Sequence, residues 1–275
     1  MAQQQTIAQE VKVSGIGLHS GVVVQVTLKP AQSDRGRYFS YQGQIIPAHI
    51  SAVSQTLLST ELRANGVSVR TVEHLLAALV GMEIDNICIE LDQHELPILD
   101  GSALPWVEAI AAVGTITQDQ PRPTQQLHQH LICQKDDGFV TAIPSSQLKF
   151  TYGIEFPTAA IGTQWYTWQP HSPESFASAI APARTFTLAS QIEHLRAANL
   201  IRGGSLENAI VCDDKKWLNP PLRFDNEPCR HKLLDLMGDF SLIGTLPPAH
   251  YLAYKASHTL HTQFIRILHD HIAIQ

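Results

Sequence analysis

The amino-acid sequence predicts an α+β fold of two similar domains. We expect each domain to be a β-sheet with helices on one face, and the two helical layers to pack together between two outer sheets. Both halves of the 275-residue chain run from strand-like to helix-like segments, without the sustained strand–helix alternation of a doubly wound sheet. A polar, Gln-rich stretch with two prolines separates the halves. The sequence therefore predicts an N-terminal domain over residues 1–120, a linker over 121–130 and a C-terminal domain over 131–275.

In the first half, short patterns predict strands and helices in turn. Apolar residues predict one strand over 22–28, where they alternate with other residues, and another over 87–91. Between these strands, an apolar stripe predicts a helix over 71–79, and the hydroxyl of Thr71 can cap its first turn. A shorter helix should follow and end at Gly114.

In the second half, the same reasoning predicts a sheet whose one face helices should cover. The strongest strand signal is the strict alternation over 148–156. The other expected elements are a hairpin with its turn at 137–138, strands over 208–212 and 251–255, and helices over 189–199, from 229 and from about 258.

The helix that begins at Cys229 carries two different rows of side chains. Its apolar residues at i, i+3, i+4 and i+7 predict one buried face: Leu233, Leu236, Met237 and Phe240. In a second row, His231, Asp235 and Asp239 follow at intervals of four residues. Two ligands on adjacent turns can bind one cation, and an open zinc site needs only one more protein ligand. The alternative is an ordinary His–Asp surface pair, worth about 0.3 kcal/mol.

The first turn of the helix over 71–79 offers a candidate for the missing ligand. Glu73 and His74 place a carboxylate beside an imidazole, which gives one candidate base and one candidate ligand. The alternative is an acidic residue that interacts favourably with the helix dipole, next to a half-exposed histidine.

Composition narrows the classes of partner. The formal net charge of -6 argues against a nucleic-acid partner, because no basic excess exists to neutralise phosphates. No apolar run approaches the roughly 18 residues of a membrane span, and the N-terminus lacks the pattern of a signal peptide. The four cysteines form no CxxC pair, so we expect free thiols in a cytoplasmic protein.

Seven separated stretches, in this order, together resemble one family, the UDP-3-O-acyl-N-acetylglucosamine deacetylases. These stretches are VEHLLAAL (72–79), IDN (84–86), PILDGSA (97–103), ARTF (183–186), GGS (203–205), RHKLLD (230–235) and AYKASH (253–258). The resemblance spans nearly the whole chain. It implies the committed deacetylation of lipid A synthesis, in which an acetamide is hydrolysed to a free amine and acetate.

The resemblance also implies roles for the catalytic residues. A Zn²⁺ ion should be held by His74, His231 and Asp235, and Glu73 should act as general base. His258 should protonate the leaving amine, with Asp239 stabilising its cationic form. The Thr185 hydroxyl should help to stabilise the tetrahedral oxyanion, although it could instead be a plain hydroxyl at a strand end.

For the substrate, the resemblance implies three further contacts. Lys232 and Lys255 should lie near its hydroxyls or diphosphate, and Phe156 near the uracil, although lysines are mostly solvated. The segment 186–205, which includes Phe186, Ile192 and Gly204, should form a passage for the acyl chain. From periodicity alone its apolar stripe would be core. The chain departs from the family where Ala256-Ser257 replaces Ser-Gly and where Pro157-Thr158 follows Phe156.

The sequence thus predicts a cytoplasmic, monomeric, zinc-dependent deacetylase acting on acylated UDP-N-acetylglucosamine, with no nucleic-acid partner, no membrane span and no covalent nucleophile. Two alternatives stay open. The protein could be an amidohydrolase for another N-acylated sugar, or a catalytically silent member that binds ligands in the same groove.

Overall fold

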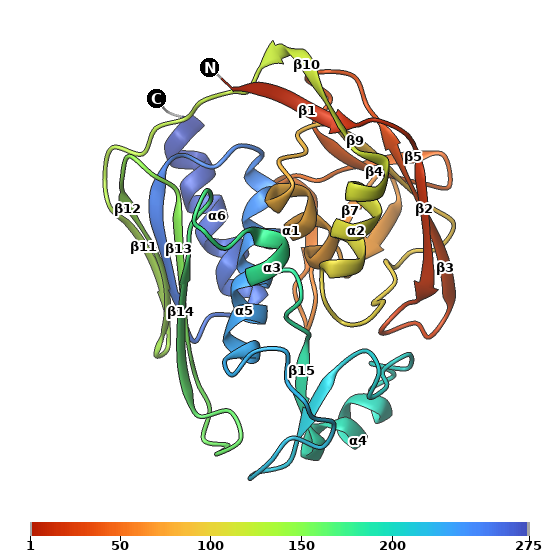
Figure 1. Cartoon of the computed structure of the whole chain (residues 1–275), viewed down its shortest axis with the longest axis vertical. Helices are drawn as coiled ribbons and strands as arrows, with labels where there is room; N and C mark the ends of the chain where they lie inside the picture. Colours follow the sequence, from red (N-terminus) through yellow and green to blue (C-terminus); the bar gives the residue numbers. More distant parts are fainter. Residues whose placement is uncertain (1, 274–275) are drawn as a thin grey trace.

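Two five-stranded sheets form the outer layers of the molecule, and helices lie between them (Figure 1). The structure, a computed structural model, describes residues 2–273. The strand order of the first sheet is β2 (Val11–Ile16), β3 (Val23–Pro30), β9 (Ile87–Leu91), β4 (Arg37–Tyr41) and β5 (Gln44–Pro47). The order of the second is β11 (Leu131–Lys135), β12 (Gly138–Pro144), β17 (Ala249–Tyr254), β13 (Lys149–Glu155) and β14 (Thr163–Trp168).

The two sheets have the same topology. In each sheet, the strand that comes last in the sequence lies at the centre. In the first sheet, β9 is antiparallel to β3 on one side and parallel to β4 on the other. In the second sheet, β17 is antiparallel to β12 and parallel to β13. The chain therefore repeats one arrangement twice, although its two halves show no clear sequence repeat. The predicted α+β fold of two similar units is confirmed.

The helices fill the space between the sheets in matching positions. In the first unit, α1 (Glu73–Gly81) precedes the central strand and α2 (Leu104–Val113) follows it; in the second, α5 (Glu227–Phe240) and α6 (His258–Ala273) do the same. A single turn, α3 (Phe176–Ala179), also belongs to the second unit. Figure 1 shows α1 and α5 side by side at the middle, and their close contact confirms the predicted meeting of two helical layers.

The packing of α1 on α5 buries more of α5 than its sequence pattern predicts. The apolar stripe predicts one buried face, but nearly every side chain of α5 is buried. A glycine permits this close approach: a Cβ atom on Gly238 would lie only 2.1 Å from the carbonyl oxygen of Glu73. The row His231, Asp235 and Asp239 therefore faces the interior between the two units rather than solvent.

The expected capping role of Thr71 is wrong. The N-cap residue of α1 is Val72, and no side chain caps the helix. Thr71 has a φ of +60°, and its hydroxyl donates to the buried Glu95 carboxylate at 3.1 Å. That carboxylate also accepts from the backbone amides of His19 and Ser20. A buried ionised acceptor that gathers three donors provides a stronger partner than a helix amide.

Part of the polar stretch at the domain boundary is ordered as a strand. Residues Thr115–Pro121 form β10, which pairs with β1 (Gln3–Ile7) in a two-stranded sheet. The proposed linker over 121–130 begins where β10 ends, and the division into two domains stays a prediction.

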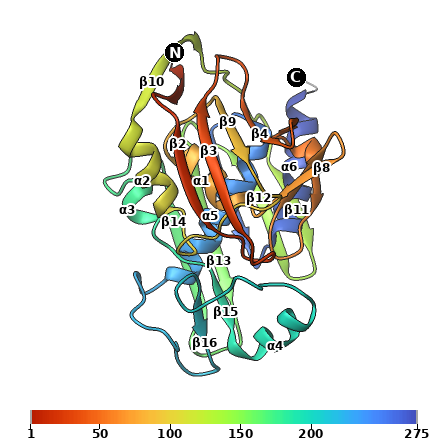
Figure 2. The same cartoon turned by 90° about the vertical axis from the view of Figure 1, so that its right-hand side faces the viewer.

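The remaining elements are small. A three-stranded sheet of β6 (Val53–Gln55), β7 (Glu61–Ala64) and β8 (Val67–Arg70) precedes α1. Short 3-10 turns cover Ile50–Ala52 and Ser241–Ile243. In the second unit, an insert consists of the parallel pair β15 (Phe186–Leu188) and β16 (Ile210–Cys212) with α4 (Ala189–Ala197). Figures 1 and 2 show that this insert lies beyond one end of the first sheet, at the level of the lower ends of β13 and β14. Among residues 2–273, no helix combines the length and the apolar character that crossing a bilayer requires.

Candidate active site

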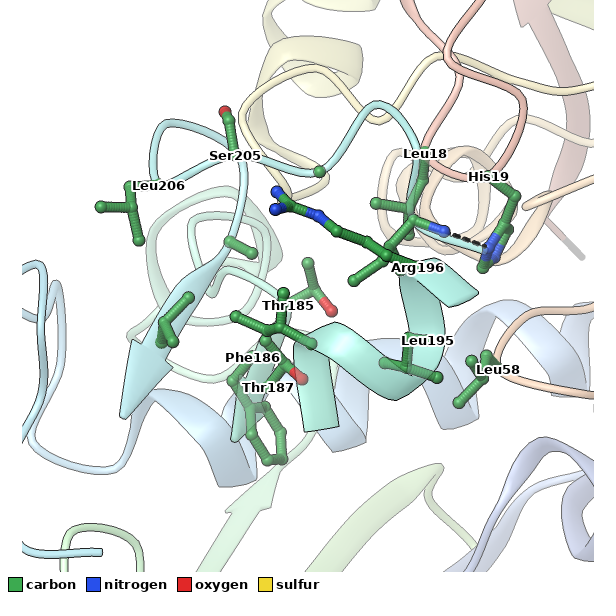
Figure 3. A pocket seen from close by; sticks show the side chains of 15 residues that line it. Leu18, His19, Leu58, Thr185, Phe186, Thr187, Leu195, Arg196, Ser205 and Leu206 are labelled. Atoms are coloured by element: carbon green, nitrogen blue, oxygen red, sulfur yellow. Dashed lines mark hydrogen bonds between the residues drawn. The ribbon is translucent and has the colours of Figure 1, made fainter. Parts of the chain in front are cut away.

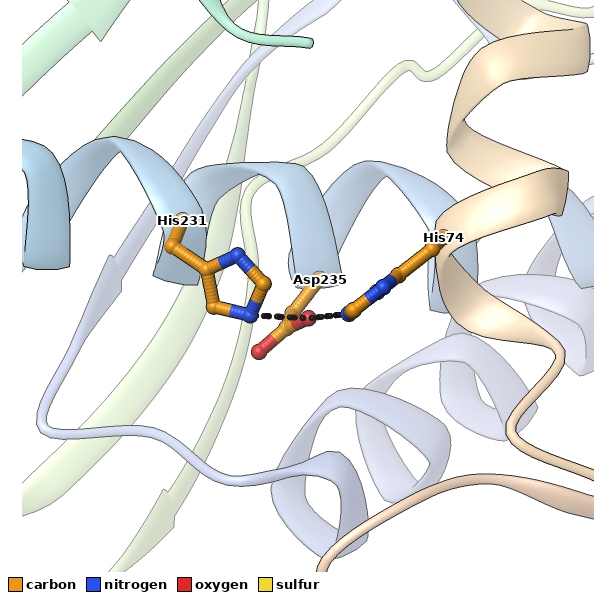
Figure 4. A group of neighbouring side chains, drawn as sticks. All are labelled: His74, His231 and Asp235. Carbon is orange, nitrogen blue, oxygen red and sulfur yellow. Dashed lines mark ion pairs between the residues drawn. The ribbon is translucent and has the colours of Figure 1, made fainter. Parts of the chain in front are cut away.

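A buried group of metal-ligand type lies where α1 meets α5. His74 comes from the first turn of α1, and His231 and Asp235 come from adjacent turns of α5 (Figure 4). The Asp235 Oδ1 atom lies 3.4 Å from His231 Nε2 and 3.7 Å from His74 Nε2. Tetrahedral donors about 2.1 Å from one zinc ion lie about 3.4 Å from each other. The donor set and its spacing therefore fit a zinc ion.

Neighbouring groups fix the state and orientation of these donors. The His231 Nδ1 atom lies 3.0 Å from the Ala183 carbonyl oxygen, so it carries the proton and Nε2 keeps its lone pair. Burial and the nearby His231 lower the pKa of His74 to about 3, which keeps it neutral. Burial would raise the pKa of Asp235, but Lys232 and the histidines hold it well below its usual value. Lys232 donates to Asp235 Oδ2 at 2.7 Å, which leaves Oδ1 facing the histidines.

The Glu73 carboxylate lies beside this group and is itself buried. Its Oε2 atom accepts a hydrogen bond from the Thr60 amide at 3.0 Å, while Oε1 lies 3.9 Å from His258 Nε2. Burial, together with the charges of Asp239 and Asp235, raises the pKa of Glu73 to about 7, against the opposite effect of His258. A carboxylate with such a pKa can accept a proton near neutral pH.

His258 begins α6 and faces Glu73 across the site. Its Nδ1 atom donates to Asp239 Oδ2 at 2.7 Å, and its Nε2 atom lies 3.9 Å from Asp235 Oδ2. Burial alone would lower the pKa of His258, but the surrounding carboxylates, Asp239 foremost, raise it to about 9. The Asp239 pKa falls to about 2 despite burial, because His258 lies beside it. The arrangement therefore holds a base and a protonated imidazole on two sides of one space.

Asp239, His258 and His261 form a second close group, but its distances are those of hydrogen bonds. The two Nδ1 atoms lie 2.7 and 2.8 Å from Asp239 Oδ2. Donors that share a tetrahedral ion lie farther apart, at about 3.4 Å. The two histidines therefore bond to Asp239, and of the two such groups among residues 2–273, the one of His74, His231 and Asp235 has the spacing of metal ligands.

Part of this group of side chains lines a central cavity of about 330 Å³. His231, Asp235 and His258 line its inner wall, and Thr185 lies on the wall that it shares with the next cavity. The backbone of Thr185 is fixed on both sides, because its amide donates to Gly101 O and its carbonyl accepts from the Ile210 amide.

An apolar cavity of about 310 Å³ adjoins the central cavity along the insert (Figure 3). Ile192 and Leu195 of α4 line it from one side, and Leu18 and His19 from the first unit line it from the other. In α4, all of whose residues are described, no side chain is fully buried. Within the segment 186–205, the apolar side chains of Ile192, Leu195 and Ile201 therefore line a cavity, whereas periodicity alone would make them core.

A third, smaller cavity of about 190 Å³ is lined by two cations, Lys232 and Lys255, and by one carboxylate, Glu155; we call it the cationic cavity. Phe156 lines both this cavity and the central one, and its ring meets that of Phe186 edge-on at 5.6 Å. Lys255 forms an ion pair with Asp137 at the turn of the β11–β12 hairpin. The three cavities thus form a continuous series: apolar, central and cationic.

The structure brings the predicted site residues into this series. The three predicted metal ligands lie together with Glu73, His258 and Asp239. The cationic cavity is lined by Lys232, Lys255 and Phe156. The apolar cavity is lined by Phe186, Ile192 and Gly204. Thr185 lies directly before β15 and lines both the central and the apolar cavity, so its position allows the oxyanion role and also matches the strand-end alternative. The chemical roles of all these residues stay predictions.

Four residues of the site were not predicted from the sequence as site residues: Thr60, Tyr152, Gly238 and His261. Two had a signal. A glycine inside a helix costs about 1 kcal/mol relative to alanine, which points to a packing reason at Gly238. His261 follows His258 by three residues and so shares its helix face. Thr60 and Tyr152 reach the site only through the tertiary fold.

Comparison with known proteins agrees with this geometry. The model of the family described as UDP-3-O-acyl N-acetylglycosamine deacetylase matches residues 4–270. A protein named UDP-3-O-acyl-N-acetylglucosamine deacetylase from Synechocystis sp. is 54% identical, covering 96% of this chain and 98% of that protein. Its namesake from Thermosynechococcus vestitus is 53% identical, covering 96% and 93%. A relative from Arabidopsis thaliana, named a probable mitochondrial deacetylase of this kind, is 44% identical, covering 96% and 87%. The chain therefore belongs to the UDP-3-O-acyl-N-acetylglucosamine deacetylase family.

Proposed function

We propose that this protein hydrolyses the acetamide of UDP-3-O-acyl-N-acetylglucosamine in a zinc-dependent reaction that releases acetate and a free amine. The observation that carries the proposal is the buried triangle of His74, His231 and Asp235, with His258 3.9 Å from Asp235 and Glu73 3.9 Å from His258. These residues provide the ligands, the base and the acid that amide hydrolysis requires.

Glu73 prepares the attacking water. The ionised carboxylate takes a proton from water as the water oxygen bonds to the acetamide carbonyl carbon. Oε2 is held by the Thr60 amide, so Oε1 is the oxygen available to the water. With its pKa raised to about 7, Glu73 is a stronger base than an exposed glutamate.

His258 completes the reaction on the nitrogen. An amide anion is too poor a leaving group, so the nitrogen must gain a proton as the C–N bond breaks. Asp239 holds Nδ1 of His258 at 2.7 Å, which leaves Nε2–H facing the central cavity. Acetate and the amine are the products, and Glu73 and His258 regain their states by exchanging protons with water.

Two further groups stabilise the charge on the carbonyl oxygen. His74, His231 and Asp235 would hold zinc, which supplies Lewis acidity that makes water more acidic and stabilises negative charge on oxygen. The Thr185 hydroxyl can donate a hydrogen bond to the same oxygen, and one such donor is typically worth about 2.7 to 4 kcal/mol.

The series of cavities fits the parts of an acylated nucleotide sugar. The acyl chain would occupy the apolar cavity, where burying each CH₂ group stabilises binding by about 0.8 kcal/mol. The acetamide would lie in the central cavity, and the diphosphate beside Lys232 and Lys255. For Lys255 this requires exchanging Asp137 for phosphate. Such a substrate would place this protein in lipid A synthesis; the cytoplasmic location and monomeric state stay predictions.

The test is a deacetylation assay with the full chain and UDP-3-O-acyl-N-acetylglucosamine, with and without a zinc chelator in matched buffers. We expect acetate and amine in equal amounts, loss of activity with the chelator and recovery with zinc. Glu73→Gln should lower kcat by about 10² to 10⁴ with zinc content unchanged. Glu90→Gln, at an exposed carboxylate of β9, is the matched control and should keep full activity.

Two outcomes would overturn the proposal. A catalytically silent member would bind the acylated nucleotide and release no acetate. An amidohydrolase for another N-acylated sugar would hydrolyse short N-acetyl sugars and leave the acylated nucleotide intact.

A further inference from the structure

The Asp239 carboxylate is the centre of a fully buried hydrogen-bond cluster. The Thr60 hydroxyl donates to Oδ1 at 2.6 Å. Two imidazoles donate to Oδ2, His258 at 2.7 Å and His261 at 2.8 Å, each through Nδ1. The His261 side chain is 0% exposed; it bonds to this carboxylate, and its ring also meets the His258 ring edge-on, with centroids 5.9 Å apart. His258, which lines the central cavity, therefore shares the Oδ2 atom of Asp239 with His261, which does not line it.

The other side of His261 reaches the backbone that leads to His258. Its Nε2 atom lies 3.1 Å from the Tyr152 hydroxyl, and this hydroxyl donates to the Ala256 carbonyl at 2.8 Å. Ala256 lies two residues before His258, and Lys255 has a φ of +47°. Such a φ is uncommon for a residue other than glycine, so surrounding bonds must hold this turn. Tyr152 supplies one of them.

Together these bonds restrain both partners of the His258–Asp239 pair. Thr60 and His261 fix the plane and rotamer of the carboxylate, and Tyr152 fixes the entry to α6. Without His261, one lone pair of Oδ2 would be left without a donor in a water-poor interior, and the carboxylate could turn toward another arrangement. The direction of Nε2–H of His258 depends on the Asp239 oxygen that holds the ring.

Resting on the proposed function, we propose that His261 is a positioning residue for the deacetylation step: through Asp239 it holds His258 in the orientation that protonates the leaving nitrogen, with Tyr152 as the second member of this layer. His261 touches neither substrate nor metal ligands, so it should affect kcat and leave KM unchanged.

Three variants separate the two contacts of His261. His261→Asn keeps an N–H near the position of Nδ1 and loses the reach to Tyr152. His261→Gln reaches toward Tyr152 and loses the Asp239 bond, and His261→Leu has neither. We expect kcat about 10-fold lower for the Gln and Leu variants and within about twofold of wild type for Asn, with KM unchanged. Equal loss in the Asn and Leu variants would overturn the proposal.

A double-mutant cycle tests whether His261 acts through His258. In the His258→Gln background the acid is gone, so adding His261→Leu should cause no further loss of kcat. A loss that multiplies with that of His258→Gln would show a merely structural role. Tyr152→Phe keeps the ring packing and is the milder variant if the others do not fold; it should lower kcat about threefold. An unchanged kcat in Tyr152→Phe would remove Tyr152 from this layer.

A readout without substrate keeps this inference separate from the proposed function. Imidazole N–H protons bonded to a carboxylate resonate far downfield in ¹H NMR. In zinc-loaded protein labelled with ¹⁵N-histidine, the Nδ1–H resonance of His258 should stay in place in His261→Asn and move in His261→Leu. A resonance that stays in place in both variants would overturn the inference. If wild type lacked deacetylase activity, the proposed function would fail and this test would still decide the coupling.

Discussion

Glu73 and His258 are both buried, yet different causes raise their pKa values. Desolvation raises the pKa of Glu73 to about 7, because burial disfavours its charged form. Desolvation would lower the pKa of His258, but nearby carboxylates, chiefly Asp239, raise it to about 9. Near neutral pH, Glu73 is therefore partly ionised and able to accept a proton, while His258 is still protonated.

We expect a bell-shaped pH dependence of kcat/KM. The active form of Glu73 is the carboxylate, so activity should rise as pH increases through about 7. The active form of His258 is the imidazolium, so activity should fall as pH increases through about 9. A bound cation close to both groups would shift both limbs to lower pH. Measuring kcat/KM from about pH 5 to about pH 10 checks this, and His258→Gln should lose the alkaline limb. An alkaline limb that persisted in that variant would contradict the assignment of the acid.

For single residues of the site, the sequence predicted the pairs that share a helix, but it could not predict the pairs that only the tertiary fold brings together. The spacing of four residues places His231 above Asp235 on any helix. The pairing with Glu73 in the first turn of a helix made His74 one candidate ligand, but among 14 histidines periodicity gives no reason to select His258. Family resemblance indicated both residues, while Thr60 gave no signal in either way.

The insert shows how an element can be apolar without being core. Ile192 and Leu195 stand one helical turn apart on the side of α4 that faces the apolar cavity. Ile192→Ala should lower kcat/KM for a long-chain substrate about 3- to 10-fold, because acyl contacts are lost, and should leave a short-acyl analogue unaffected. Steady-state kinetics with both substrates measures this. The exposed neighbour Glu193→Ala is the matched control. Equal losses on both substrates would contradict an acyl-binding role.

The contact of α1 with α5 depends on one glycine. Gly238→Ala would place a methyl group 2.1 Å from the Glu73 carbonyl, so the helices must move apart. We expect a lower free energy of unfolding, by about 1 to 3 kcal/mol, measured by urea denaturation, together with a lower kcat because Glu73 moves with its carbonyl. Wild-type stability and activity in this variant would show that the helices separate at little cost.

Elements with local signals were predicted, and those that depend on distant partners were not. The strand pattern over 148–156 and the helix from 229 correspond closely to β13 and α5. Strand β10 is mostly exposed and polar, so its strand state depends on pairing with β1 and not on its own residues. The capping error at Thr71 has the same origin, because Glu95 is remote in sequence.

At the scale of the whole molecule, the site lies across the boundary between the two units. One candidate metal ligand comes from α1 of the first unit and two come from α5 of the second. His19 of the first unit also accepts from the Ile201 amide of the insert at 3.4 Å. A ligand in this site therefore contacts both halves and should stabilise their association.

Metal removal should consequently destabilise the protein. An ion present at about 100 times its Kd contributes about 2.7 kcal/mol, so a chelator should lower Tm by about 5 °C. Differential scanning calorimetry checks this in matched buffers. In His231→Ala, which lacks a ligand, the chelator should have no effect on Tm. A wild-type Tm that did not respond to the chelator would contradict metal binding by these residues.

The sequence by itself determined the strands and helices that have strong local patterns, the α+β class, the His–Asp row of α5 and, through resemblance, the family and its candidate residues. Only the tertiary structure decided the shared topology of the two sheets, the burial of α5 on nearly all sides, the series of three cavities and the cluster around Asp239. The physical reason is how far apart in the sequence the interacting residues lie. Helical and strand periodicities are set by neighbours a few residues apart, whereas cavities, buried carboxylates and their pKa values arise from groups that only folding brings together.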